Sequence, residues 1–135
     1  EANNSKKYLA LSRDEILKNA DKQQSLLLLQ VEDKNGAVLS ENIIYFVPFK
    51  ALKLASPDIQ MNTKKVTKGY EIELSTDILA KNVYLESEKD GFFSDNYFDV
   101  LPGQSVRILF SCEEDRPNLK DKIQIRTLDD TYEMN

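Results

Sequence analysis

The chain contains no histidine and only one cysteine, Cys112. Histidine is the usual general base and a common metal ligand, so its absence excludes Ser-His-Asp and Cys-His catalytic arrangements. A structural zinc site is built mainly from cysteine and histidine ligands, which this sequence cannot supply. Because Cys112 falls on the inward side of an alternating segment, we expect it to be a small buried hydrophobic residue rather than a nucleophile.

Glycine and long apolar runs are also scarce. The four glycines, at positions 36, 69, 91 and 103, are too widely spaced for a G-x-G-x-x-G or P-loop phosphate cradle. The longest apolar run, from Ile43 to Val47, ends at Pro48, whereas a bilayer span needs about 20 residues. We therefore expect no cofactor, no metal and no membrane segment. The chain begins with Glu1 and shows no signal-peptide pattern, which predicts a processed or excised piece of a longer protein.

The charge is acidic, with 18 Lys and Arg residues against 23 Asp and Glu residues. An acidic surface repels a nucleic-acid backbone unless basic side chains gather in a patch, and here they are scattered along the sequence. We therefore expect no nucleic-acid partner. A chain of 135 residues with a hydrophobic fraction of 41% is long enough to bury one core without disulfides or metals.

Short alternating segments make up most of the pattern. Residues 70–75 and 106–112 alternate apolar and polar side chains, which is typical of strands with one buried face. Residues 24–32 are apolar on both faces and lead into Asn35-Gly36, a hairpin signal whose type I′ turn needs positive φ at both residues. The alternative at this acidic turn is a calcium-binding loop, but the ligand spacing of an EF-hand is missing.

Several short strands without a long helical period predict an all-β chain, an immunoglobulin-like antiparallel β-sandwich of about 7–9 strands. One domain is expected over residues 8–130, between a tail at residues 1–7 and a second tail at residues 131–135. A single helical turn is expected after Ser12, because Ser12 and Glu15 have the spacing of a capping box.

The stretch from Gly91 to Gly103 holds four aromatic side chains, those of Phe92, Phe93, Tyr97 and Phe98. Turn signals accompany them. Ser94-Asp95-Asn96 offers short polar side chains that bond nearby backbone, and Pro102-Gly103 favours a turn with positive φ at the glycine. We predict that the four rings point inward and lock two stacked sheets together.

Acidic and aromatic side chains define two candidate sites. Asp95 and Asp99 have the residue types of a glycosidase pair, which needs two carboxyls about 5 to 9 Å apart in a cleft. The turn signal favours the alternative that Asp95 and Asn96 bond backbone groups in the turn, so we predict no catalytic residue. Tyr45, Tyr84 and Tyr97 are candidate platforms for stacking against a sugar if their rings face solvent, and core-edge residues if they do not.

Three segments together resemble the C-terminal immunoglobulin-like domain of β-mannosidases in glycoside hydrolase family 2. They are Tyr45-Phe46-Val47-Pro48 with its continuation to Leu54, the segment from Leu79 to Leu85, and F-S-D-N-Y-F-D-V-L-P-G from Phe93 to Gly103. The last segment is the most specific of the three. The resemblance implies an immunoglobulin-like sandwich that accompanies a catalytic (β/α)₈ barrel.

The resemblance also implies a function. In similar enzymes the two catalytic glutamates lie in the barrel, which needs about 250 residues, so no catalytic role transfers to this chain. The implied function is a noncatalytic accessory domain whose partners are the other domains of the same parent chain. Similar bacterial enzymes are often exported, which implies a periplasmic or secreted location. The alternatives are a carbohydrate-binding module for mannose-containing polysaccharides or glycans, and a protein-interaction domain with an exposed apolar patch.

Overall fold

The computed structural model describes residues 6–88, 90–113 and 118–131. Most of the two tails expected at residues 1–7 and 131–135 therefore lies outside the described residues. In the described part, the helices are α1 (Arg13–Leu17), η1 (Phe49–Ala51), η2 (Leu119–Lys122) and η3 (Asp129–Thr131). The strands are β1 (Leu26–Glu32), β2 (Val38–Tyr45), β3 (Ile59–Val66), β4 (Gly69–Thr76), β5 (Ala80–Ser87), β6 (Phe92–Phe93), β7 (Phe98–Val100), β8 (Ser105–Ser111) and β9 (Ile123–Arg126).

The strand ladders are antiparallel, which confirms the predicted all-β class. They form three sheets, β1-β2, β3-β4-β8-β6 and β7-β5-β9. The chain divides into two compact units, residues 1–53 with the first sheet and residues 54–135 with the other two. This differs from the single domain predicted over residues 8–130. Alternation identifies a strand but not the sheet that it joins, so the sequence pattern carries no signal for a boundary after Lys53.

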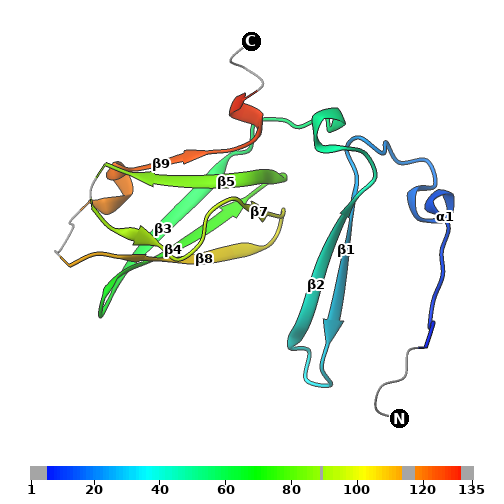
Figure 1. Ribbon diagram of the computed structural model, residues 1–135, viewed down its shortest axis with the longest axis horizontal. Helices are drawn as coiled ribbons and strands as arrows, with labels where there is room; N and C mark the ends of the chain where they lie inside the picture. Colours follow the sequence, from blue (N-terminus) through cyan, green and yellow to red (C-terminus); the bar gives the residue numbers. More distant parts are fainter. Residues whose placement is uncertain (1–5, 89, 114–117, 132–135) are drawn as a thin grey trace. The chain divides into compact units, whose positions relative to one another are not determined.

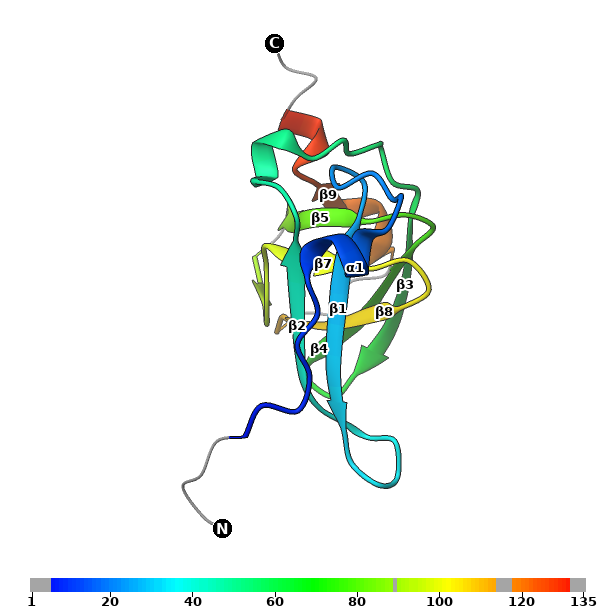
Figure 2. The same ribbon diagram turned by 90° about the vertical axis from the view of Figure 1, so that its right-hand side faces the viewer.

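In the first unit, β1 and β2 form a hairpin (Figure 2). The predicted hairpin is confirmed, but its turn is not type I′, because Gly36 has a φ of 81° while Asn35 has no positive φ. The Gly36 N–H donates to the Asp33 carbonyl at 3.0 Å, as in a type I turn followed by a left-handed glycine. The Asp33 carboxylate accepts the N–H groups of Ala37 and Asn35, which lowers its pKa. The Asp33 carboxylate therefore stabilises the turn.

The capping box predicted at Ser12 is present. The Glu15 N–H donates to the Ser12 hydroxyl at 3.2 Å, and the Ser12 N–H donates to the Glu15 carboxylate at 2.7 Å. These two bonds satisfy two of the N–H groups that a helix start leaves without intrahelical partners. They account for the start of the helical turn α1 after Ser12.

The second unit is a sandwich of the four-stranded and three-stranded sheets, in which β5 and β9 lie over β3, β4 and β8 (Figure 1). Its core takes alternate side chains from both sheets. The largest fully buried side chains are Phe110, Ile72, Leu74, Leu85, Val83 and Val100. The alternation predicted for residues 70–75 and 106–112 is thus confirmed on β4 and β8, where Ile72 pairs with Ile108.

The aromatic stretch differs from the prediction. Phe93 and Phe98 pack against the core, but Phe92 is 82% exposed and Tyr97 is 69% exposed. Phe92 and Phe93 are neighbours on β6, and successive strand residues point to opposite faces of a sheet, so one of the two rings faces solvent. Among the described residues, the aromatic ring that is completely buried is that of Phe110 on β8, whose centroid lies 4.8 Å from that of Phe93.

Replacement of Phe110 tests this core assignment. Phe110→Ala removes a fully buried ring, so we expect the free energy of unfolding to fall by about 3 to 5 kcal/mol. Phe98→Ala removes a ring that is only partly buried, and we expect about 2 kcal/mol. Urea denaturation of the two variants measures the difference. Equal losses, or a larger loss for Phe98→Ala, would contradict the assignment.

Two glycines with positive φ provide a second, matched test. Gly103 has a φ of 75° in the predicted turn and open space around its Cα, so Gly103→Ala adds only left-handed strain of about 1 kcal/mol. Gly69 has a φ of 129°, and a Cβ there would meet the Phe110 carbonyl oxygen at 2.0 Å. We expect Gly69→Ala to cost roughly 3 kcal/mol because overpacking adds to strain. Thermal melts that give the two variants the same loss would rule out the close approach.

Candidate functional site

A nearly buried polar cluster of the second unit joins β5 to β7. The Lys81 ammonium donates to both oxygens of the Asp99 carboxylate, at 2.9 and 3.1 Å. The side chains of Lys81 and Asp99 are only 6% and 12% exposed. The backbone N–H of Asn82 also donates to Asp99, at 3.0 Å. A nearly buried charge needs this kind of full pairing, so Asp99 serves as an anchor between the two strands.

Asn96 lies beside the same strand. The Leu85 N–H donates to the Asn96 side-chain carbonyl at 2.6 Å, and the Asn96 side-chain amide donates to the Leu85 carbonyl at 3.1 Å. These two bonds reproduce the pair of contacts that a neighbouring strand residue would make. The Asn96 N–H donates to the Asp95 carboxylate at 2.8 Å. The prediction that these side chains bond backbone groups in the turn is confirmed for Asp95, whereas the Asn96 side chain bonds the backbone of Leu85 on β5. Asp95 and Asp99 have different partners.

Tyr97 follows in a conformation that is rare for a bulky residue. Its φ is 61°, in the left-handed region, and its N–H donates to the Val83 carbonyl at 2.7 Å. Its ring stacks on that of Tyr84, with the centroids 5.1 Å apart and the planes at 26°. Tyr97 remains 69% exposed, so the stacked pair presents aromatic surface to solvent.

On the edge of β5 away from β7, the residue paired with Tyr84 is charged. Tyr84 on β5 pairs in register with Arg126 on β9, and the Arg126 guanidinium lies 3.6 Å from the Glu86 carboxylate. Because Val83 pairs with Phe98, Tyr97 lies just before β7 and level with Tyr84. A row therefore runs across this sheet from Tyr97 through Tyr84 to Arg126. We call these three residues the aromatic row.

The three tyrosines predicted as sugar platforms have different positions. Tyr84 and Tyr97 lie together in the aromatic row of the second unit. Tyr45 belongs to the first unit, where its ring meets Phe49 edge-on with centroids 5.3 Å apart and planes at 87°. Sequence reasoning did not identify Arg126 as part of the row. The register of β5 against β9 places it there, and no local motif encodes that register.

A hollow of about 770 Å³ lies at the end of the sandwich where the β3–β4 turn approaches β6. Its lining includes Lys68, Asp90, the exposed Phe92 and Glu113. Cys112 also lines it and is only partly buried, whereas a buried residue was expected. This hollow lies off the aromatic row, because Phe92 belongs to β6 in the other sheet.

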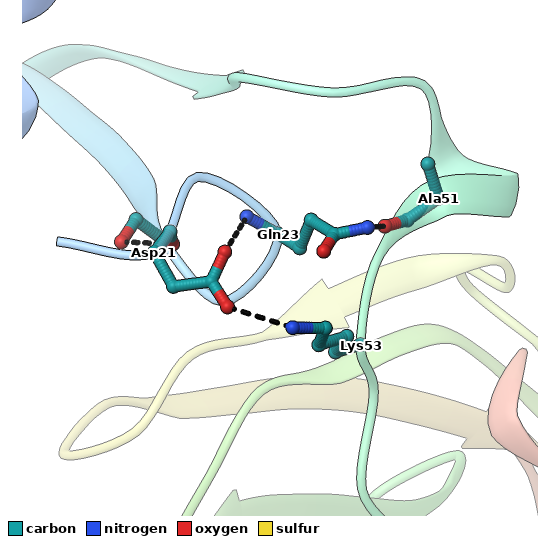
Figure 3. Close-up of polar contacts among 5 residues, drawn as sticks. Asp21, Gln23, Ala51 and Lys53 are labelled. Carbon is teal, nitrogen blue, oxygen red and sulfur yellow. Dashed lines mark hydrogen bonds and ion pairs between the residues drawn. The ribbon is translucent and has the colours of Figure 1, made fainter.

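The first unit has a polar cluster of its own, drawn in Figure 3. The Asp21 carboxylate accepts the Gln23 N–H at 2.9 Å and a bond from the Lys53 ammonium at 2.9 Å. The Gln23 side-chain amide donates to the Ala51 carbonyl at 3.0 Å, and the Lys53 N–H donates to the Gln23 carbonyl at 3.0 Å. The segment before β1 is thereby tied to the end of the first unit.

No group of three or more His, Cys, Asp or Glu side chains that could hold a metal ion occurs among the described residues. Within the same part of the chain, no helix is long and apolar enough to cross a membrane.

The buried ion pair provides a third prediction. Asp99→Asn removes the carboxylate charge beside the nearly buried Lys81 ammonium, so we expect the free energy of unfolding to fall by about 3 kcal/mol. Adding Lys81→Met also removes the buried positive charge and should recover much of that loss. Glu73→Gln is the control, because its pair with Arg107 is largely exposed and worth less than about 1 kcal/mol. Chemical denaturation measures all three, and an Asp99→Asn loss no larger than the control loss would contradict the role of the pair.

Acid should open the Asp21 cluster. Bonds from the Gln23 N–H and the Lys53 ammonium lower the pKa of Asp21 in the folded chain. A lowered folded pKa means that the carboxylate stabilises the cluster above its unfolded pKa of about 3.9 and loses this effect as pH falls through the folded value. We therefore expect the Gln23 amide NMR signal to hold its position near neutral pH and to shift only below about pH 4. A carboxyl titration in the Asp21 side chain at or above its unfolded pKa would contradict this.

Comparisons with known proteins divide the chain at the same place as the structure. The family model Ig_mannosidase, described as "Ig-fold domain", matches residues 54–131, which are more than half of the chain. The model Mannosidase_ig, described as "Mannosidase Ig/CBM-like domain", matches residues 1–51. No curated protein matches the chain.

One similar solved structure is the β-D-mannosidase from Dictyoglomus thermophilum. It aligns with a TM-score of 0.69 and 20% sequence identity, over 83% of this chain and 14% of that enzyme. At this identity the match establishes a shared fold. The chain thus spans a small part of the length of the enzyme that it resembles in fold.

Proposed function

Because this chain belongs to the Ig_mannosidase family of Ig-fold domains, we propose that it is a noncatalytic accessory part of a β-mannosidase-like glycoside hydrolase of family 2. The observation that carries the proposal is the uneven coverage of the structural match. The match takes in 83% of this chain but 14% of the β-D-mannosidase, so this fold accompanies a much larger enzyme. The catalytic barrel of such an enzyme would lie outside these residues.

The polar chemistry of the second unit is consistent with an accessory role. A retaining glycosidase needs two carboxyls about 5 to 5.5 Å apart, one acting as nucleophile and the other as acid and base. Asp99 is held by Lys81, and Asp95 accepts the Asn96 N–H. Both carboxylates are therefore engaged in fixing the chain between β5 and β8.

In this proposal the partners of the chain are the other domains of its parent polypeptide. The sandwich contributes a rigid body, because its core draws on both sheets and its β5–β7 junction is tied by buried polar bonds. Export to the periplasm or the medium is part of the same proposal and depends on the resemblance to exported bacterial enzymes.

Hydrolysis of an aryl β-mannoside tests the proposal. We expect this chain alone to release no more phenol than buffer does, and the complete parent polypeptide to be active. Deleting residues 54–131 from the parent should lower its thermal midpoint while residual activity persists below that midpoint. Activity of the isolated chain that survives repurification would overturn the noncatalytic assignment, and a parent with no β-mannosidase activity would overturn the assignment of the enzyme.

Carbohydrate binding is the second candidate function. The observation in its favour is the stacked and exposed pair of Tyr84 and Tyr97. Calorimetry with mannooligosaccharides tests it, and the absence of binding heat at millimolar sugar would count against it.

A further inference from the structure

We propose that the aromatic row on the β7-β5-β9 sheet binds a chain of β-linked hexopyranose units, with the Tyr97 ring as the stacking platform. This site belongs to the second unit alone. The choice of mannose as the sugar rests on the proposed function, whereas the stacking site itself does not.

The backbone of Tyr97 is strained. A left-handed φ costs a non-glycine residue about 1–2 kcal/mol, and glycine or asparagine accepts it more readily than a bulky ring does. Yet the chain places a tyrosine there and fixes it with the bond from its N–H to Val83. Tyr97 is 69% exposed, so core packing does not account for a bulky residue at this position. Local strain retained under an exposed side chain points to use of that side chain.

The surroundings of the row favour a sugar over a protein surface. Arg126 and Glu86 are 61% and 50% exposed, and Arg126 lies within 3.5 Å of the Gln124 side-chain oxygen. The core of a protein interface is enriched in aromatic and arginine side chains but depleted of acidic ones, whereas the Glu86 carboxylate and the Gln124 amide border this row. Here one aromatic platform is bordered by exposed hydrogen-bonding groups, which suits a ligand that has a flat C–H face and a rim of hydroxyls.

The geometry of pyranose rings narrows the ligand class. A β-linked mannose or glucose unit has three axial C–H groups on one face and no axial oxygen there, so this face lies flat on an aromatic ring. An α-linkage places the axial glycosidic oxygen on that same face and prevents close stacking. The platform should therefore prefer β-linked over α-linked chains. Hydroxyls at the ring edge would reach Arg126 and Glu86 on the neighbouring strands.

Titration calorimetry with β-1,4-linked mannohexaose tests the site on the 135-residue chain. Tyr97→Gly removes the ring and relieves the left-handed strain, so the variant should stay folded and bind at least about tenfold more weakly. Tyr97→Phe keeps the ring and should bind mannohexaose with the same affinity as the unsubstituted 135-residue chain. Phe92→Ala is the matched control, because it removes another exposed ring of the same unit from the other sheet. It should leave the affinity unchanged.

The outcomes separate this site from the proposed function. Two results together support both the stacking site and the proposed function. Mannohexaose binds the unsubstituted chain and shifts the NMR signals of Tyr84, Tyr97 and Arg126, and this binding is lost in Tyr97→Gly. Binding of cellohexaose with the same dependence on Tyr97, but not of mannohexaose, supports the site and removes the link to mannose. Binding of neither sugar, equal loss in Phe92→Ala, preference for an α-linked mannan, or saturation only by a protein partner would overturn the inference.

Discussion

The side-chain amide of Asn96 bonds both the N–H and the carbonyl of Leu85, and the geometry of the surrounding turn depends on this contact. It gives β5 the partner that a further strand residue would otherwise provide. Because both bonds are part-buried, they compete little with water and fix the turn. Tyr97 comes next in the chain, and its left-handed conformation follows from where Asn96 and Phe98 are held.

Strand β5 carries both a buried anchoring residue, Lys81, and an aromatic residue, Tyr84, three residues later. Lys81 and Asp99 fix β7 on β5, and the rings of Tyr84 and Tyr97 stack on each other next to this junction. The ion pair and the stacked rings differ in burial, because the Lys81 and Asp99 side chains are nearly buried while Tyr97 is mostly exposed. A nearly buried ion pair is strongly destabilising when one partner is removed, while an exposed ring contributes little to folding and remains free for contact with a ligand. The motif that resembles β-mannosidases therefore combines a structural clamp with a surface feature.

Local signals in the sequence predicted local structure well. The capping box at Ser12, the turn at Gly103 and the bond from the Asn96 N–H to the Asp95 carboxylate depend on neighbours within a few residues, and all are present. The alternation on β4 gave the buried face correctly. Features set by distant partners were missed. The exposure of Phe92 depends on which sheet β6 joins, and the boundary after Lys53 depends on which strands pair.

The site was predictable only in part for the same reason. Tyr84 and Tyr97 were recognisable as aromatic candidates, but their stacking requires the register of β7 on β5, and the place of Arg126 requires that of β9. Tyr45 is also a tyrosine, but it lies in the first unit and its ring contacts Phe49 instead. Residue type thus identifies candidates, and strand pairing decides which of them meet.

Asn96 holds the Tyr97 ring against Tyr84 through its two bonds to Leu85. Nuclear Overhauser contacts between the two rings, compared in the unsubstituted 135-residue chain and in Asn96→Ala, test this role. We predict strong ring contacts in the unsubstituted chain and their loss in the variant, while the signals of the buried Phe110 ring stay in place. Ring contacts of undiminished strength in Asn96→Ala would contradict the role of Asn96.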